Sequence, residues 1–596
     1  MSERHTAVNG DPGAECTGAS DATASKWLAL GTTESPAISL NSAVLWGNPA
    51  AIHSARHPFH AWPQGLLLLC LATASLAQQP APSAPPASAA PQAQTADPGQ
   101  PKPETHITTE QAKQLFGLVD ELIKFSSQET GLPIKSQVKR QITSRAAVET
   151  YLNQKFQEDE SAKRLQQGEI VLKKFGLLDR DFALKPFLLA LLKEQIEAYY
   201  DSKSKTVFLL DWVDIDEQKA VLAHELTHAL QDQHSDLEKW NDQTPDQVSL
   251  NSHDDTDHLA RDEMDTAREA VVEGQATAVM MDYILKPLGK SLVKDPEVLD
   301  LVKQQMSGSE SSPILARAPL LLSESLLFPY REGLSFEQDV WMDQGQTAAF
   351  AGAMDRPPTS SWEIINPREY ERKRVPAVPL LPDIHPLVDK LYKPYDIGQI
   401  GQLDVHILAE LFGGDDAARD LTPAWDGGLY WAGQQLGART PAELASTKSI
   451  ALFYLSAWKN RASAESFARL YADELGRKYD NLKPDPAAER SAASTLPPGS
   501  TEQVYSSSEG SIVITIRGKL VFVAESFPLD LARKLTALFL DAQGTGELQM
   551  ARTTHQGTSG LTPQPLEPLT ANLIRFLSDS GVIKSAVDAA VHSAGK

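Results

Sequence analysis

The sequence predicts an α+β protein with a mostly helical region at residues 107–445, which contains one small β-hairpin, and a smaller α/β region at residues 446–596. At 596 residues the chain is too long for one ordinary domain. Long segments of the first region repeat apolar residues at three- and four-residue spacings, which is typical of helices that bury one face. Short β-branched and aromatic runs near residue 200, and again from residue 448, indicate strands.

The first 106 residues are expected to lie outside the folded part. Leu66–Ala77 is an apolar run of about a dozen residues, shorter than the roughly 20 that span a bilayer, and it ends in small residues suited to a signal peptidase. We therefore expect residues 1–77 to be a leader with a secretory signal peptide, with the true start between Val44 and Arg56. Residues 78–106 are rich in proline and alanine and predict a disordered linker. The protein is then expected to be secreted or periplasmic, with no membrane span after the leader.

Charge and cysteine content narrow the function classes. The chain has 55 lysines and arginines against 78 acidic residues, a net charge of −23, and this balance disfavours nucleic-acid binding because phosphate contacts need a basic surface. The two cysteines, Cys16 and Cys70, both fall in the predicted leader. A disulfide framework or a thiolate metal site is therefore not expected, and any metal must be bound by histidine or carboxylate side chains.

The first folded region begins with helical patterns, for example at Thr109–Phe125 and Ala146–Gln157. Ile196–Tyr200 and Lys205–Val213 then form a hairpin pattern around a polar four-residue turn. Asp214 and Glu217 have the spacing of a capping box and are expected to open a helix that runs through the letters AVLAHELTHALQDQ. A second long helical pattern covers residues 264–287 and stops at Pro287.

The second folded region has a mixed pattern. Residues 371–385 are rich in proline and basic residues and predict a boundary loop. The remaining expected elements are a turn at 425–428, a strand at 449–458, a helix at 463–478, a loop at 485–501, a hairpin at 510–527 and a helix at 528–542. The pattern contains no catalytic constellation, so we expect an accessory domain.

His224-Glu225-Leu226-Thr227-His228 is the motif that carries chemistry. In a helix, residues four apart lie on one face, so both imidazoles can reach one metal ion. Glu225 lies about 100° around the helix from His224, which directs it toward a water on the metal rather than toward the metal. Zn²⁺ lowers the pKa of such a water toward about 7, and a carboxylate can accept its proton. These groups suffice to hydrolyse an amide bond.

The third metal ligand is open to three residues. His234 has the spacing of the metzincin family, in which a glycine three residues after the second histidine ends the helix. Here Gln231 stands at that position, and a continuing helix would rotate His234 away from His228 by roughly 240°. Glu273, in an apolar segment that reads VVEGQA, needs a partner, and Gly274 beside it would let this helix and the helix that contains HELTH approach closely. Glu269, one turn earlier, is the remaining candidate.

Residues 196–285 resemble a zinc metallopeptidase of the gluzincin type, and the hairpin, the helix and VEGQA together are similar to secreted bacterial zincin-like proteins of mostly unassigned substrate. The resemblance implies a zincin-like fold in which His224, His228 and Glu273 bind zinc and Glu225 is the catalytic base. It also implies that Lys205–Leu210 is an edge strand that pairs with the substrate backbone.

One position departs from the thermolysin-like members of that type. They carry an aspartate four residues after the ligand glutamate, where it orients a metal-bound histidine, and here Thr277 occupies the position. Asp232 or Glu269 could supply that contact. The oxyanion that forms during hydrolysis also needs a hydrogen-bond donor, for which Tyr330 and His258 are the candidates.

The leading hypothesis is an exported zinc-dependent peptidase that acts on peptides or proteins. One alternative is a zinc hydrolase that cleaves a non-peptide amide of the cell envelope. Another is a catalytically silent, peptidase-like envelope binding protein, although a structural zinc site would have no need of the base Glu225.

Overall fold

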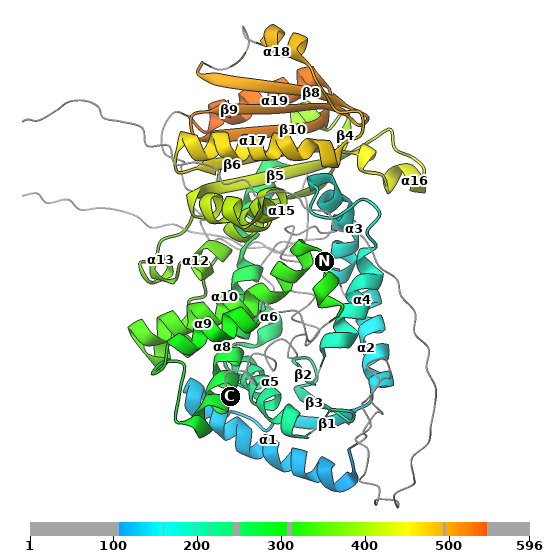
Figure 1. Ribbon diagram of the computed structural model, residues 1–596. Helices are drawn as coiled ribbons and strands as arrows, with labels where there is room; N and C mark the ends of the chain where they lie inside the picture. Colours follow the sequence, from blue (N-terminus) through cyan, green and yellow to red (C-terminus); the bar gives the residue numbers. More distant parts are fainter. Residues whose placement is uncertain are drawn as a thin grey trace, which may run out of the picture. The chain divides into compact units, whose positions relative to one another are not determined.

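The computed structural model describes residues 107–544, apart from residues 159, 197, 214, 242–250, 307–312, 493–495 and 497 (Figure 1). The predicted leader and linker lie outside these residues, and so do the predicted cap at Asp214 and the end of the second region. Within the described part, helices and strands form an α+β structure, as the sequence predicts. None of the described helices has the length and apolarity that a membrane span requires.

The first part of the described chain is mostly helical and contains one small sheet. Its main elements, in chain order, are α1 (Thr109–Thr130), β1 (Lys139–Thr143), α2 (Arg145–Glu158), α3 (Glu160–Phe175), α4 (Leu184–Gln195), β2 (Ala198–Asp201), β3 (Thr206–Leu210), α5 (Ile215–Ser235), α6 (Leu237–Asn241), α7 (Ser252–Arg261), α8 (Met264–Leu285), α9 (Glu297–Met306), α10 (Leu320–Gln344), the π-helix η4 (Ala348–Gly352), α11 (Ala353–Asp355), α12 (Ser361–Ile365), α13 (Pro367–Glu371) and α14 (His385–Val388).

The predicted hairpin is present, but its second strand is not at an edge. β2 and β3 pair antiparallel, and β3 also pairs in parallel with β1, so the strand order is β1-β3-β2. The prediction that Lys205–Leu210 is an edge strand is therefore wrong. The reason is the strand Lys139–Thr143, whose charged letters KRQIT and mostly solvent-facing side chains give no apolar strand signal.

The second part of the described chain is built around a seven-stranded antiparallel sheet, drawn at the top of Figure 1. The strand order is β4-β5-β6-β10-β9-β8-β7. Its elements are β4 (Tyr392–Gln399), α15 (Gln402–Leu421), β5 (Trp425–Gln435), α16 (Pro441–Leu444), β6 (Ile450–Trp458), α17 (Arg461–Lys478), β7 (Lys483–Pro484), α18 (Pro486–Ala492), β8 (Ser500–Ser507), β9 (Gly510–Arg517), β10 (Leu520–Phe527) and α19 (Leu529–Ala542).

The sheet corrects three predictions. β4 and β5 precede residue 446, so the predicted boundary between 445 and 446 cuts through the sheet. The expected turn at 425–428 is the start of β5, where the pairing with β6 shifts register between Trp425 and Gly428, a bulge that glycine accommodates. The expected loop at 485–501 contains the helix α18. The strand β6, the helix α17, the hairpin β9–β10 and the helix α19 are confirmed.

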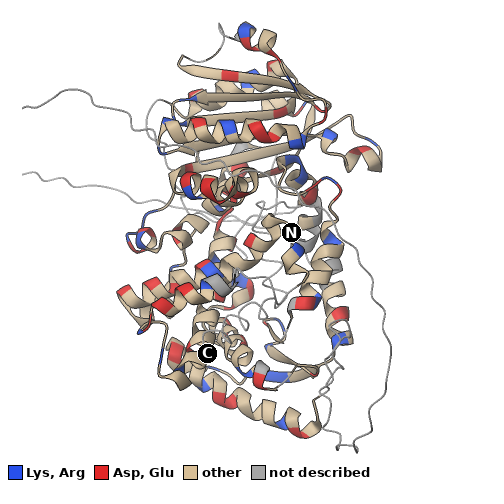
Figure 2. Ribbon diagram, in the orientation of Figure 1, with Lys and Arg blue, Asp and Glu red and all other residues tan. Residues whose placement is uncertain are grey.

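Both faces of the large sheet are covered by helices, which explains its apolar strands. Tyr454 of β6 packs in the core that includes Phe467 of α17, whereas the adjacent Phe453 packs in the core that includes Phe539 of α19. Because side chains alternate between the faces of a strand, every residue of β6 is buried. In Figure 2 the strands of this sheet are nearly free of charged residues, which lie mainly on the helices.

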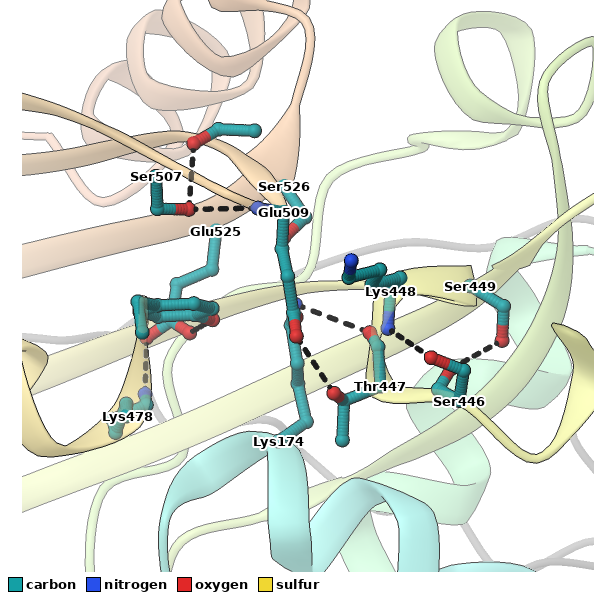
Figure 3. Close-up of polar contacts among 12 residues, drawn as sticks. Lys174, Ser446, Thr447, Lys448, Ser449, Lys478, Ser507, Glu509, Glu525 and Ser526 are labelled. Carbon is teal, nitrogen blue, oxygen red and sulfur yellow. Dashed lines mark hydrogen bonds and ion pairs between the residues drawn. The ribbon is translucent and has the colours of Figure 1, made fainter. Parts of the chain in front are cut away.

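A buried ionic network joins α3 to this sheet (Figure 3). Lys174 Nζ of α3 donates to Glu509 Oε2 at 2.8 Å and to Ser526 Oγ at 2.6 Å. Lys478 Nζ of α17 donates to Glu525 Oε1 at 2.6 Å. These two lysine–glutamate pairs, which we call the lysine cluster, have almost no solvent exposure, so neither lysine nor glutamate could be buried there without the other.

Candidate metal centre

α5 and α8 bring two histidines and a glutamate together in the interior. The helix that contains the HELTH letters runs from Ile215 to Ser235, and the helix that contains VEGQA runs from Met264 to Leu285, both as predicted. Glu273 Oε2 lies 3.0 Å from His224 Nε2 and 3.5 Å from His228 Nε2. We call His224, Glu225, His228 and Glu273 the histidine cluster.

The spacing within the histidine cluster fits a tetrahedral metal ion. Zinc binds imidazole nitrogen and carboxylate oxygen at about 2.0–2.1 Å, so two ligand atoms at tetrahedral angles stand roughly 3.3–3.4 Å apart. The two measured separations, 3.0 and 3.5 Å, lie on either side of this value. Ligand atoms of His224, Glu225 and His228 also lie within 4.8 Å of one another. The group could therefore hold a metal ion.

Burial and charge act against each other on Glu273. Burial raises the pKa of its carboxyl, but the charge of His228 and the hydrogen bonds from both imidazoles outweigh burial and lower this pKa to about 2. Burial likewise lowers the pKa of His228, but the nearby carboxylates of Glu273 and Glu225 leave it above its ordinary value. In the protein without metal, these carboxylates therefore favour the protonated form of His228.

A chain of side-chain amides fixes the orientation of His228. Its Nδ1 lies 2.9 Å from Gln231 Oε1, and Gln231 Nε2 donates to Val272 O at 3.0 Å and to Gln275 Oε1 at 2.9 Å. Gln275 Nε2 in turn donates to the carbonyls of Ala349 and Phe350 in the π-helix η4. Because Gln231 Oε1 can only accept, Nδ1 carries the proton and the Nε2 lone pair is left for a metal.

The sequence prediction missed Gln231 and assigned its role to Asp232 or Glu269. Asp232 instead accepts hydrogen bonds from Tyr200, Lys205 and the backbone N–H of Leu237. The signal that could have identified Gln231 is its position three residues after His228, which places both side chains on neighbouring parts of one helical face.

The other candidate ligands are arranged differently. α5 continues through His234 without a break, and His234 Nε2 contacts Asp355 Oδ1 at 3.0 Å, so the structure does not bring it to the cluster. Glu269 is buried one turn before Glu273 on α8, close enough to raise the pKa of Tyr330. Glu273 contacts both histidines.

A glycine contact between α8 and α10 places Tyr330 beside the cluster. A Cβ added to Gly274 would lie 2.3 Å from the backbone of Gly333, and one added to Gly333 would lie 2.1 Å from the Ala270 carbonyl. Gly274 does permit a close helix approach, but the sequence predicts the helix that contains HELTH as the neighbour, whereas the structure places α10 there. Three residues before Gly333, Tyr330 lies with its ring 6.2 Å from the His224 ring and within hydrogen-bonding reach of Glu273.

The two oxyanion candidates differ in position. Tyr330 is buried, and burial together with the surrounding carboxylates raises the pKa of its hydroxyl well above the ordinary value, so the group keeps its proton and can donate a hydrogen bond. His258 lies on α7, where its Nε2 is 3.4 Å from Asp262 Oδ1 in a separate buried group of acidic residues. The structure brings Tyr330 to the histidine cluster and does not bring His258 there.

Comparisons with known proteins add nothing to this geometry. No family model, no curated protein and no solved structure matches the chain.

Proposed function

We propose that the protein is an exported zinc metallopeptidase that cleaves peptides or proteins. The observation that carries the proposal is the contact of one Glu273 oxygen with the Nε2 atoms of both His224 and His228, with Glu225 on the same turn of α5. Two imidazoles and one carboxylate at this spacing form a donor set that suits zinc and would leave the fourth coordination position for substrate or water. The leader predicted from the sequence supports export.

The chain's own residues divide the chemistry among them. His224, His228 and Glu273 would hold the ion, and Gln231 keeps His228 in the tautomer that can bind it. Bound zinc supplies a Lewis acid that polarises a carbonyl and acidifies water. Glu225 would accept a proton from the attacking water and return it to the leaving amine. Tyr330 would donate a hydrogen bond to the oxyanion.

The position of the substrate follows from the strand order. Because β3 is central, a peptide that adds to the small sheet must pair with β1 or β2. β2 is the strand that lies against α5, and Tyr200 of β2 hydrogen-bonds to Asp232 of α5. We therefore replace β3 by β2 as the strand that would pair with the substrate backbone.

The test is the substitution Glu225→Gln, which keeps the shape of the side chain and removes the base. We expect zinc content to stay unchanged and cleavage of casein or of a peptide library to fall about 1,000-fold, within the range for loss of a general base. Glu238→Gln on the exposed surface of α6 is the matched control. If the zinc-loaded wild-type protein shows no cleavage of any peptide that is lost in Glu225→Gln, the proposal is wrong.

A further inference from the structure

An open pocket, lined mostly by residues with polar groups, lies along α5 beyond the histidine cluster. Its volume is about 230 Å³, smaller than the roughly 300–1,000 Å³ of pockets that enclose a whole drug-sized ligand. This size suits one chemical group of a ligand that extends beyond the pocket. The lining comes from the segment before β1, from β2, from the turn between β2 and β3, and from the end of α5: Lys135, Ser136, Gln137, Val138, Tyr200, Lys205, Asp232 and Gln233. We call it the Lys135 pocket.

The Lys135 pocket is close to the histidine cluster along the same helix. Asp232 in its wall comes four residues after His228, which corresponds to about 6 Å along the axis and about 40° of rotation. His224, His228 and Asp232 therefore follow one another on one side of α5. Tyr200 belongs to β2, the strand proposed to pair with the substrate, so a peptide on that strand would pass near the pocket.

The one acidic group in the pocket lining is already saturated with donors. Lys205 Nζ lies 2.8 Å from both oxygens of Asp232, Tyr200 Oη donates to Oδ2 at 2.7 Å, and the N–H of Leu237 donates to Oδ1 at 3.1 Å. Burial and the contact with Asp232 raise the pKa of Tyr200, so its phenol stays a donor. Asp232 thus fixes one wall of the pocket. Because both of its oxygens already accept hydrogen bonds from the protein, it does not attract an added cation.

The ammonium groups of the pocket lysines have more N–H donors than the hydrogen bonds that hold them use. Lys135 Nζ is held by one hydrogen bond, at 2.8 Å to the carbonyl of Gln233 in the last turn of α5, and an ammonium group has three N–H donors. Lys205 has a left-handed backbone (φ 55°), a strained conformation that in proteins often accompanies function. Two ammonium groups and one carboxylate give the lining one net positive charge, in a chain whose net charge is −23.

We propose that the Lys135 pocket binds a carboxylate of the peptide substrate, at or beside its C-terminal end. This inference rests on the proposed peptidase function and adds a substrate class to it, namely short peptides cleaved near their C-terminus. The carboxylate would come from the main-chain terminus or from an acidic last side chain, and Lys135, exposed and held at the helix end, would be its main partner.

The experiment measures binding to the full-length Glu225→Gln variant, which is not expected to turn substrate over. The probes are N-dansyl tetra-alanine as the free acid, the same peptide as its C-terminal amide, and an amide whose last residue is glutamate. We expect the free acid to bind about tenfold more tightly than the alanine amide, as one charge-assisted hydrogen bond provides. Tight binding of the glutamate amide as well would identify any terminal carboxylate as the ligand, and weak binding would identify the main-chain terminus.

The variant Lys135→Ala in the same background should abolish the preference, and Lys135→Arg should retain it. Lys203→Ala, in the turn between β2 and β3 but outside the pocket lining, is the control for lost charge and should leave the preference intact. Equal binding of acid and amide, a preference that survives Lys135→Ala, or no binding of any of the three peptides would overturn the proposal.

The same materials separate this inference from the proposed function. If zinc-loaded wild type cleaves peptide amides as well as acids, the peptidase stands and the carboxylate site falls. If wild type cleaves nothing while Glu225→Gln binds the acid selectively through Lys135, the carboxylate site stands and the peptidase falls.

Discussion

Glu273 and Glu525 are both buried carboxylates, but the residues around them differ in kind. Glu525 accepts hydrogen bonds from Lys478, Tyr471 and Tyr479, so a lysine supplies the balancing charge from within the chain. Glu273 contacts two imidazoles instead. When both imidazoles are neutral, Glu225 and Glu273 leave the histidine cluster with a charge of −2, which a divalent cation would balance.

This difference separates a structural cluster from a cluster that could hold a metal ion. The lysine cluster is complete without any added group, and its role is to join α3 and α17 to the large sheet (Figure 3). The histidine cluster has to take its balancing charge from solution, as a proton on His228 or as a metal ion. Substitutions in one cluster should therefore change stability, and those in the other should change metal affinity.

The largest effect is expected from Glu525→Gln in the lysine cluster. The substitution leaves Lys478 buried without its counter-charge, which should lower the free energy of unfolding by about 3–5 kcal/mol, measured by denaturant titration. Zinc content should not change. Glu465→Gln, which breaks the exposed pair with Arg461, should cost less than about 1 kcal/mol. Equal costs for the two variants would show that the lysine cluster contributes no special stability.

Glu273→Gln in the histidine cluster should have the complementary effect. Loss of a charged ligand should lower zinc affinity at least about 100-fold, or about 2.7 kcal/mol, measured by competition with a chromophoric chelator. His234→Gln on the same helix as the two histidines should leave the affinity unchanged, because His234 pairs with Asp355. The reverse result would make His234 the third ligand and would overturn the assignment.

Gln231→Leu tests whether the amide chain supports the metal centre. Without the acceptor at Gln231 Oε1, His228 is no longer held in the metal-binding tautomer, and zinc affinity should fall about 10- to 100-fold. Gln233→Leu, two residues further along α5, is the control and should leave zinc affinity unchanged. If both variants bind zinc like wild type, the contact with His228 Nδ1 has no role in metal binding.

The smallest effect is a pH dependence of the metal-free protein. The pKa of His228 is raised above 6.5, so the stability it contributes is fully present below pH 6.5 and is lost as the pH rises through its pKa in the folded protein. The pKa of Glu273 is lowered from 4.5 to about 2, so its contribution is present above pH 4.5 and is lost as the pH falls toward 2.

The histidine cluster should therefore stabilise the metal-free protein most between about pH 4.5 and 6.5. Thermal unfolding of wild type and His228→Gln at pH 5.5 and pH 8.5 measures this: the difference between the two proteins should shrink at the higher pH. Zinc affinity should change in the opposite direction and rise with pH, because protons compete with the metal for His228. A difference that is the same at both pH values would contradict the assignment.

Local patterns were sufficient to predict α5, α8 and the histidine cluster. His224, Glu225 and His228 share one helix, and their relative positions follow from helical geometry alone. Glu273 was a candidate because an acid within an apolar helix needs a partner, and it was preferred because VEGQA resembles the ligand motif of gluzincins. These predictions depend on a few neighbouring residues, and the structure agrees with them.

Features that depend on distant segments could not be predicted in the same way. β1 pairs with β3 in parallel from more than 60 residues away. The polar sequence of Lys139–Thr143 does not indicate that this segment is a strand or which strand it pairs with. β4 and β5 contain glycine and proline and are interrupted by register shifts, which makes them resemble loops. The position of Gln231 three residues after His228 is a local signal, but its contact with Gln275 depends on the packing of α8.

The contact between Gly274 and Gly333 has a consequence for how accurately the histidine cluster is built. Metal and catalytic groups have to be held within about 0.5 Å of their working positions. Backbone touches backbone where α8 and α10 cross, so no side chain is present there that could change rotamer and absorb a displacement. Glu273 lies on α8 and Tyr330 on α10, each within one turn of that crossing. The backbone contact therefore fixes the distance between them, which should be among the least variable in the molecule.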